Sequence, residues 1–255
     1  MARLWIIVGS LVTVAALGAT TYNIVSLIAH EEVTESVTFD ATDLRSIRLH
    51  NDSGSVEIVG DDVDEVTVVA DISHGLQRTR TQAAIDGDRL VLDMDCPSGP
   101  VDTWCSVAYR IIVPSGLDVD VENEDGPITL RDLEGGVAVD GDEGAIDLAR
   151  LGGHVDVATS EGGVRASGLR GDTVHARSED GSVRLSFAEA PTTVTARTSD
   201  GAVEVVVPDD EATYRVRVDN IVGAIDTAVR TDPSSGRTIV ADTDNGSITV
   251  RYPTG

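Results

Sequence analysis

Apolar and polar residues alternate in a pattern that repeats along most of this chain. The repeats align on glycines that in most cases follow an acidic or amide residue: Gly54, Gly126, Gly144, Gly162, Gly181, Gly201, Gly223 and Gly246. From Gly126 onward these glycines recur every 18 to 23 residues. The residues seven positions before and two positions after each glycine are always Val or Ile, and those five before and four after are mostly apolar. Such a regular register indicates internal copies of one structural unit.

Each repeat is predicted to contain two short strands. Alternation with a period of two places every second side chain on the same face, so one face of each strand is buried and the other faces solvent. An acidic residue followed by glycine joins the strands, because glycine supplies the positive φ that a tight turn requires. A second, apolar corner follows the second strand, at Leu133, Leu151, Leu169 and Phe187.

One such repeat cannot bury its apolar face alone, whereas stacked copies form a continuous core. The sequence therefore predicts an all-β fold, a β-solenoid whose two-strand coils of 18–23 residues occupy residues 119–255. An antiparallel β-sandwich is the alternative that fits the same alternation, and the near-constant period favours the solenoid. We expect the chain to end at an open sheet edge, where Pro253 follows the last strand and protects it.

Residues 40–118 contain the first coil, around Gly54, and then depart from the period. Strand-like runs at residues 66–70, 90–94 and 107–113 predict an irregular N-terminal cap, which solenoids need to protect their first coil. Cys96 and Cys105 flank a segment with Pro and Gly. In an exported domain such a close pair predicts a disulfide that closes a surface loop; two free thiols are the alternative.

Residues 4–29 form an uncharged, largely apolar segment. It exceeds the roughly 20 residues that cross a bilayer as a helix, so we predict a transmembrane anchor followed by a linker over residues 30–39. Arg3 precedes the segment and acidic residues follow it, which favours a cytoplasmic N-terminus (residues 1–3) and an extracytoplasmic remainder at the cell membrane. A cleaved signal peptide is the alternative, although Leu17 and Leu27 stand where a cleavage site requires small residues.

The charge of the chain narrows its possible partners. It has 44 acidic and 19 basic residues, a formal net charge of −25, and no lysine. A chain this acidic repels phosphates instead of releasing their counterions, which argues against nucleic acid as a partner. Aromatic residues make up only 3% of the chain, so the core is expected to consist of small aliphatic side chains.

The order of these features resembles a known family. An N-terminal membrane segment, a first SGSVEI turn, a VPSG step and repeated coils with a corner such as SGLRGDTV are similar to the bacterial putative-adhesin family of β-strand-repeat proteins. The similarity extends over nearly everything after residue 30. It implies a β-solenoid of the cell surface or envelope and transfers no catalytic residues.

Signatures of catalysis and of common metal sites do not occur in the sequence. His154 and His175 fall on polar strand positions, and we interpret them as solvated surface residues. One column of carboxylates remains, at the positions just before the turn glycines: Asp125, Glu143, Glu161, Asp180 and Asp200. Such a ridge could recruit Ca²⁺ through its oxygens. We favour the alternative that the turn chemistry alone demands acidic residues, so no cofactor and no catalytic residue is predicted.

Three functions fit this picture. The leading hypothesis is a non-catalytic, membrane-anchored module that binds an envelope polysaccharide or protein. A structural or sensory partner of an envelope membrane protein is the second, and self-association through the open C-terminal edge is also conceivable. A polysaccharide-cleaving enzyme of the β-helix type is the third, disfavoured because the acidic residues recur as periodic turn residues instead of forming an irregular cluster.

Overall fold

The computed structural model describes residues 31–75, 79–96 and 105–253, all of them strands and connecting turns. No helix in these ranges is long and apolar enough to cross a membrane. The predicted anchor, residues 4–29, lies outside the described residues, as does residue 30 of the predicted linker.

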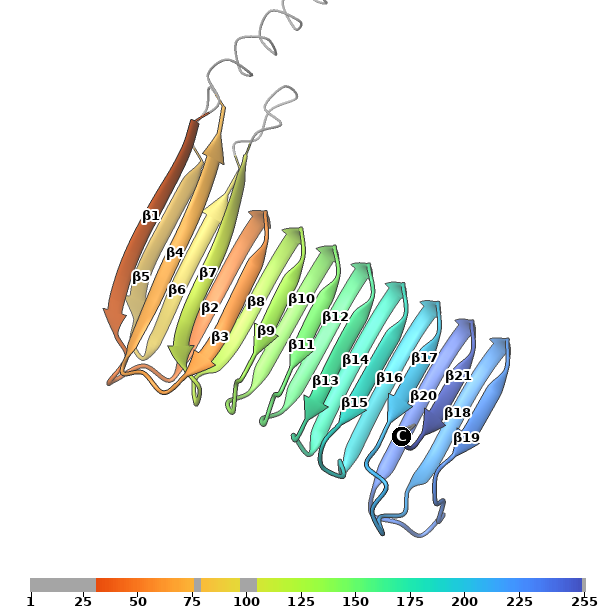
Figure 1. Ribbon diagram of the computed structural model, residues 1–255. Helices are drawn as coiled ribbons and strands as arrows, with labels where there is room; N and C mark the ends of the chain where they lie inside the picture. The colour runs from red at the N-terminus through yellow and green to blue at the C-terminus, as the bar shows by residue number, and fades with distance from the viewer. Residues whose placement is uncertain (1–30, 76–78, 97–104, 254–255) are drawn as a thin grey trace, which may run out of the picture.

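Two sheets run along the whole length of the stack (Figure 1). The 11-stranded sheet contains, in spatial order, β1 (Glu31–Asp40), β4 (Glu65–His74), β7 (Ser106–Pro114), β3 (Val56–Asp61), β9 (Ile128–Arg131), β11 (Ile146–Ala149), β13 (Val164–Leu169), β15 (Val183–Phe187), β17 (Val203–Val206), β21 (Ile248–Arg251) and β19 (Ile225–Ala228). The 10-stranded sheet contains β18 (Arg215–Val222), β20 (Thr238–Asn245), β16 (Thr193–Asp200), β14 (Thr173–Asp180), β12 (Val155–Glu161), β10 (Val137–Glu143), β8 (Asp118–Asp125), β2 (Ser46–Ser53), β6 (Arg89–Asp95) and β5 (Arg80–Asp86).

Equivalent positions of successive repeats stand directly beside one another. Val137 of β10 pairs with Val119 of β8 on one side and Val155 of β12 on the other, and the strands are parallel. The second strands of the repeats are likewise parallel, with Ile146 between Ile128 and Val164. This pairing confirms the predicted β-solenoid and excludes the antiparallel sandwich.

The core lies between the two sheets and consists of the columns predicted from the alternation. The Val and Ile residues seven before and two after the turn glycines are at most 2% exposed in every repeat except the one around Gly223. The corner residues Leu133, Leu151, Leu169 and Phe187 are buried as well. The core is therefore aliphatic, as expected, and Tyr109 and Tyr214 are among the few aromatic side chains buried in it.

The N-terminal cap extends both sheets. The predicted runs become β4, β6 and β7, and β7 continues the 11-stranded sheet beside β3. Residues 31–40, which fall largely in the predicted linker, instead form β1, antiparallel to β4. Without β1, the edge of β4 that faces away from β7 would expose a row of unpaired backbone N–H and C=O groups. β1 pairs with this edge.

The distal end differs from the expectation that the last strand of the chain is the edge. The last repeat of the chain, β20 and β21, lies between the repeat around Gly201 and the repeat around Gly223. β20 pairs with both β16 and β18, and β21 pairs with both β17 and β19. The terminal coil is therefore β18–β19, around Gly223. Arg237 holds the returning chain by donating to the carbonyl oxygens of Ala190 and Pro191 at 2.6 and 3.0 Å. Pro253 follows an interior strand and does not protect the edge.

Candidate functional site

The turn glycines are needed for stacking as well as for turning. At most of them φ is strongly positive, for example +141° at Gly162. A Cβ atom on Gly162 would also lie 2.0 Å from the carbonyl oxygen of Gly144, the equivalent glycine of the preceding coil. The same clash recurs at each of the turn glycines from Gly126 to Gly246, so the turns pack backbone against backbone.

A buried polar ladder, which the sequence pattern above does not predict, lies beneath six of the eight turns, three positions before the glycine. Its buried side chains are Asn51, Asn123, Thr159, Ser178, Thr198 and Thr243. Ser178, Thr198 and Thr243 each donate a hydrogen bond to the turn-glycine carbonyl of the coil before, at 2.7 to 3.0 Å. Six of the eight turn-glycine carbonyls thus accept a hydrogen bond from a side chain of this column: those of Gly54, Gly126, Gly162, Gly181, Gly201 and Gly246. The signal in the sequence is a column of small polar residues among apolar ones.

The carboxylate ridge forms in the register that the sequence predicts. Asp125, Glu143, Glu161, Asp180 and Asp200 stand side by side on consecutive strands, and Asn245 follows Asp200. All five carboxylates are exposed. Arg177 and Arg197 bind Glu179 and Asp242 instead of the ridge. Within the described ranges, no three ridge carboxylates gather their oxygens at one point.

We expect millimolar Ca²⁺ to leave the thermal unfolding midpoint unchanged, compared with a chelator at matched ionic strength. A Ca²⁺ ion takes about 6–8 oxygen ligands, whereas the ridge offers its carboxylates singly along a line. Circular dichroism of the purified protein measures this. A large upward shift would instead make the ridge a binding site, because only a ligand that prefers the folded state stabilises it in this way.

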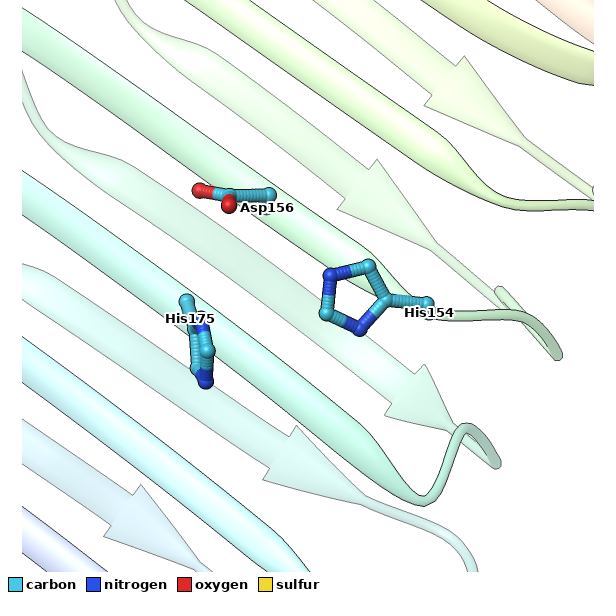
Figure 2. Close-up of side chains that lie close together, drawn as sticks. All are labelled: His154, Asp156 and His175. Carbon is cyan, nitrogen blue, oxygen red and sulfur yellow. The ribbon is translucent and has the colours of Figure 1, made fainter.

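A second cluster combines His154, which directly precedes β12, with Asp156 of β12 and His175 of the neighbouring strand β14 (Figure 2). One ligand atom from each residue lies within 4.8 Å of the other two. The two imidazole rings meet edge to face, with 5.6 Å between their centroids. His154 and Asp156 are exposed and His175 is half-buried.

The parallel register brings these three residues together. Asp156 and His175 are direct neighbours on adjacent strands, and His154 points to the same face two residues before Asp156. The prediction that both histidines lie on the polar face is consistent with their exposure. The two histidines are not predicted to lie close together, although the repeat alignment places Asp156 and His175 in one column. That shared column is the signal that could have found the cluster.

Another group, His50, Asp52 and Asp95, surrounds the disulfide. Cys96 and Cys105 are joined, with 5.6 Å between their Cα atoms. Asp52 accepts a hydrogen bond from the backbone N–H of Cys96 at 2.6 Å and lies 3.3 Å from Nε2 of His50. These contacts fix the start of the loop, whose residues 97–104 lie outside the described ranges, and this arrangement is structural.

The terminal coil β18–β19 leaves apolar side chains uncovered. Ile221, Val222 and Ile225 are 77%, 60% and 47% exposed. Ile225 belongs to a column whose other members are at most 1% exposed, because each of them has a coil on both sides. Beneath this coil the Tyr214 side chain is fully buried, and burial raises the pKa of its hydroxyl to about 12. The end of the stack is therefore a surface shaped for one more strand in each sheet.

Comparison with solved structures finds similar proteins at low identity. A putative cell adhesion protein from Clostridium sporogenes is 10% identical, with 88% of this chain and 100% of that chain covered and a TM-score of 0.40. A putative adhesin from Bacteroides fragilis is 13% identical, and a putative lipid binding protein from Parabacteroides distasonis is 10% identical. Each covers 88% of this chain and 97% of its own, with a TM-score of 0.37. No curated protein matches the chain.

The family profile described as Toastrack DUF4097 matches residues 42–252. This range contains every coil of the solenoid and all of the cap except β1 and the start of the turn that follows it. The protein therefore belongs to the Toastrack DUF4097 family.

Proposed function

We propose that this protein is a non-catalytic, membrane-anchored adhesin of the cell envelope that binds a partner protein through its terminal coil. The observation that carries the proposal is the open end of the stack. β18 and β19 each pair on one side only within the described part of the chain, and their apolar columns lack the coil that covers every other repeat. Solenoids normally cap such ends, because free strand edges and apolar columns attract other chains.

Position along the stack supports this use of the end. The described chain begins at β1, and β18–β19 lie at the opposite end (Figure 1). With the uncharged segment at residues 4–29 in the membrane, the terminal coil is the part of the stack farthest from the anchor along its long axis. Charge supports it too: the two strands of this coil are locally neutral, with Arg215 and Arg217 against Asp219 and Asp226, on a chain whose net charge is −25. Repulsion of an acidic partner by these strands is therefore weaker than the net charge of the chain implies.

The chemistry of the end favours a protein strand as the ligand. Free backbone N–H and C=O groups accept an added strand by main-chain hydrogen bonds, and alternate side chains of that strand would cover Ile225 and its neighbours. The ridge carboxylates stand singly along a line of turns, and this arrangement does not favour catalysis over binding.

The test combines topology with crosslinking on intact cells. Protease added outside the cells is expected to digest residues 31–255 and to spare the N-terminus. The double variant Ile221→Lys and Ile225→Lys is expected to abolish a crosslinked partner, because lysine on an edge strand blocks strand addition. Ile85→Lys is the matched control and should retain the partner, because this exposed isoleucine lies on β5, the edge strand at the other end of the same sheet.

Three results would contradict the proposal. Protection of residues 31–255 from external protease would remove the envelope location. A partner retained by the double variant, with unfolding behaviour like that of the wild type, would remove the terminal coil as the binding surface. A dimer that sediments in pure protein and dissolves in the double variant would replace a foreign partner with a second copy of this chain.

A further inference from the structure

We propose that His154, Asp156 and His175 bind one divalent transition-metal ion of the Zn²⁺ class. They present two imidazole nitrogens and a carboxylate oxygen within 4.8 Å of one another. Zn²⁺ bound to such ligands at about 2.0–2.2 Å in tetrahedral geometry separates the ligand atoms by about 3.3–3.6 Å. The strand register already fixes the three Cα positions, so rotation of exposed side chains suffices to close the gap.

The ligand atoms of this cluster are available. Over residues 31–75, 79–96 and 105–253, no hydrogen bond or ion pair joins the His154 or His175 ring nitrogens, or the Asp156 carboxylate, to another residue. The other described histidines differ. His50 lies 3.3 Å from Asp52 and 3.6 Å from Glu122, and His74 lies 3.7 Å from Glu31 and 3.1 Å from a backbone carbonyl. Among the histidines that the structure describes, only His154 and His175 bring ring nitrogens together without another partner.

The surroundings favour a cation and leave room for it. Gly136, just before β10, and Ala138 of β10 lie beside the cluster and have little or no side chain, so a groove opens next to His154 and Asp156. The groove is lined by four carboxylates, those of Asp88, Asp118, Asp120 and Asp156, and by two guanidinium groups, those of Arg45 and Arg89. The excess of negative charge raises the local concentration of cations. Three protein ligands beside an open groove leave a fourth coordination position for water or for a donor from outside the chain.

The donor set selects the class of ion. Ca²⁺ and Mg²⁺ prefer oxygen ligands, whereas imidazole suits Zn²⁺, Cu²⁺ and Ni²⁺. Two nitrogens and one oxygen therefore distinguish this site from the carboxylate ridge, which offers oxygen alone. The inference is independent of the proposed adhesive end, since the cluster lies on the middle coils and β18–β19 lie at the end of the stack.

Isothermal titration of the full-length protein, free of any histidine tag, with ZnCl₂ tests the site. We expect one Zn²⁺ per chain, unaffected by excess Mg²⁺. His154→Ala and His175→Ala should each weaken binding by at least about tenfold, because each removes one of three ligands. Asp156→Asn keeps the shape of the side chain and should weaken binding as well. His50→Gln is the control, since its ring already faces two carboxylates, and should bind as the wild type does.

Nuclear magnetic resonance of the imidazole nitrogens provides a readout that does not depend on affinity. Zn²⁺ is expected to shift the His154 and His175 signals together and to leave that of His50 in place. Equal thermal unfolding of all variants in chelator would show that the substitutions leave the fold intact. The proposal is wrong if wild-type protein binds no Zn²⁺, if both alanine variants bind as tightly as wild type, or if only His50→Gln loses the ion.

Discussion

Replacing Gly162 by alanine is expected to lower the free energy of unfolding by about 3–4 kcal/mol. The new Cβ would lie 2.0 Å from the carbonyl oxygen of Gly144, on a backbone with φ of +141°. The clash cannot relax locally. The Gly144 N–H donates to the backbone carbonyl oxygen of Glu161 at 2.9 Å, and the Gly162 N–H donates to that of Asp180 at 3.0 Å. Relief of the clash therefore requires adjacent coils to separate.

Two other glycines separate stacking from backbone strain. Gly87 has a φ of +65° with no atom within 4 Å of a Cβ, so Gly87→Ala should cost only about 1–2 kcal/mol. Gly116 has neither feature, and Gly116→Ala should stay within about 0.5 kcal/mol of the wild type. Urea unfolding followed by circular dichroism gives all three values, provided that the slopes agree. A loss at Gly162 no greater than that at Gly87 would show that the turns do not stack backbone on backbone.

Replacing Asn123 by alanine is expected to cost about 2–4 kcal/mol, the second-largest effect. The Asn123 side chain is 1% exposed. Its Nδ2 donates to the carbonyl oxygens of Gly126 at 3.0 Å and Gly54 at 3.2 Å, and its Oδ1 accepts from Nδ2 of Asn51 at 2.6 Å. Alanine would remove the side-chain donor of the Gly126 carbonyl and open a cavity between two coils. It would also leave Asn51 Nδ2 with only its longer contacts, to the carbonyl oxygens of Gly54 at 3.4 Å and Val107 at 3.5 Å.

The neighbouring residue and a conservative change provide the controls for Asn123. Glu124 is exposed on the same strand, and Glu124→Ala should change stability by less than about 0.5 kcal/mol. Asn123→Thr should lose less than Asn123→Ala, because Thr198 and Thr243 reach the preceding turn carbonyl from the equivalent position. Equal losses for Asn123→Ala and Glu124→Ala in the same urea experiment would show that the buried polar ladder contributes nothing.

The repeat was readable from the sequence because each coil places the same residue types in the same environments. Val137 and Val155 have equivalent neighbours, so the same selection on size and polarity acts at both. The carboxylate ridge was predictable for the same reason, since parallel stacking converts equal positions in the repeat into a row in space. The polar ladder also forms because equal positions of the repeat stack in a row. Its polar residues do not belong to the apolar columns that define the repeat.

The His154 cluster shows where reading by columns is insufficient. Asp156 and His175 share a column, and His154 belongs to another, two residues earlier. Their proximity depends on which coils are adjacent and on rings that turn toward each other across a strand boundary. Neither the adjacency of the coils nor the orientation of the rings can be read from the residues of a single repeat.

The solenoid, its register, its aliphatic core and its acidic turns follow from local alternation and from a recurring period, and both can be read along the chain. Which coil lies at the end depends on how the repeats stack in space. The repeats around Gly223 and Gly246 carry the same key residues, with Val216 and Ile239 in one column and Ile225 and Ile248 in another, so either could form the edge. The chain places the later repeat inside, where Ile248 and Val250 are fully buried, and leaves Thr227 at the end in a column that is otherwise mostly apolar. Because the buried coil has Val250 at that position, its burial avoids the cost of desolvating a hydroxyl there, and the open surface lies on β18–β19.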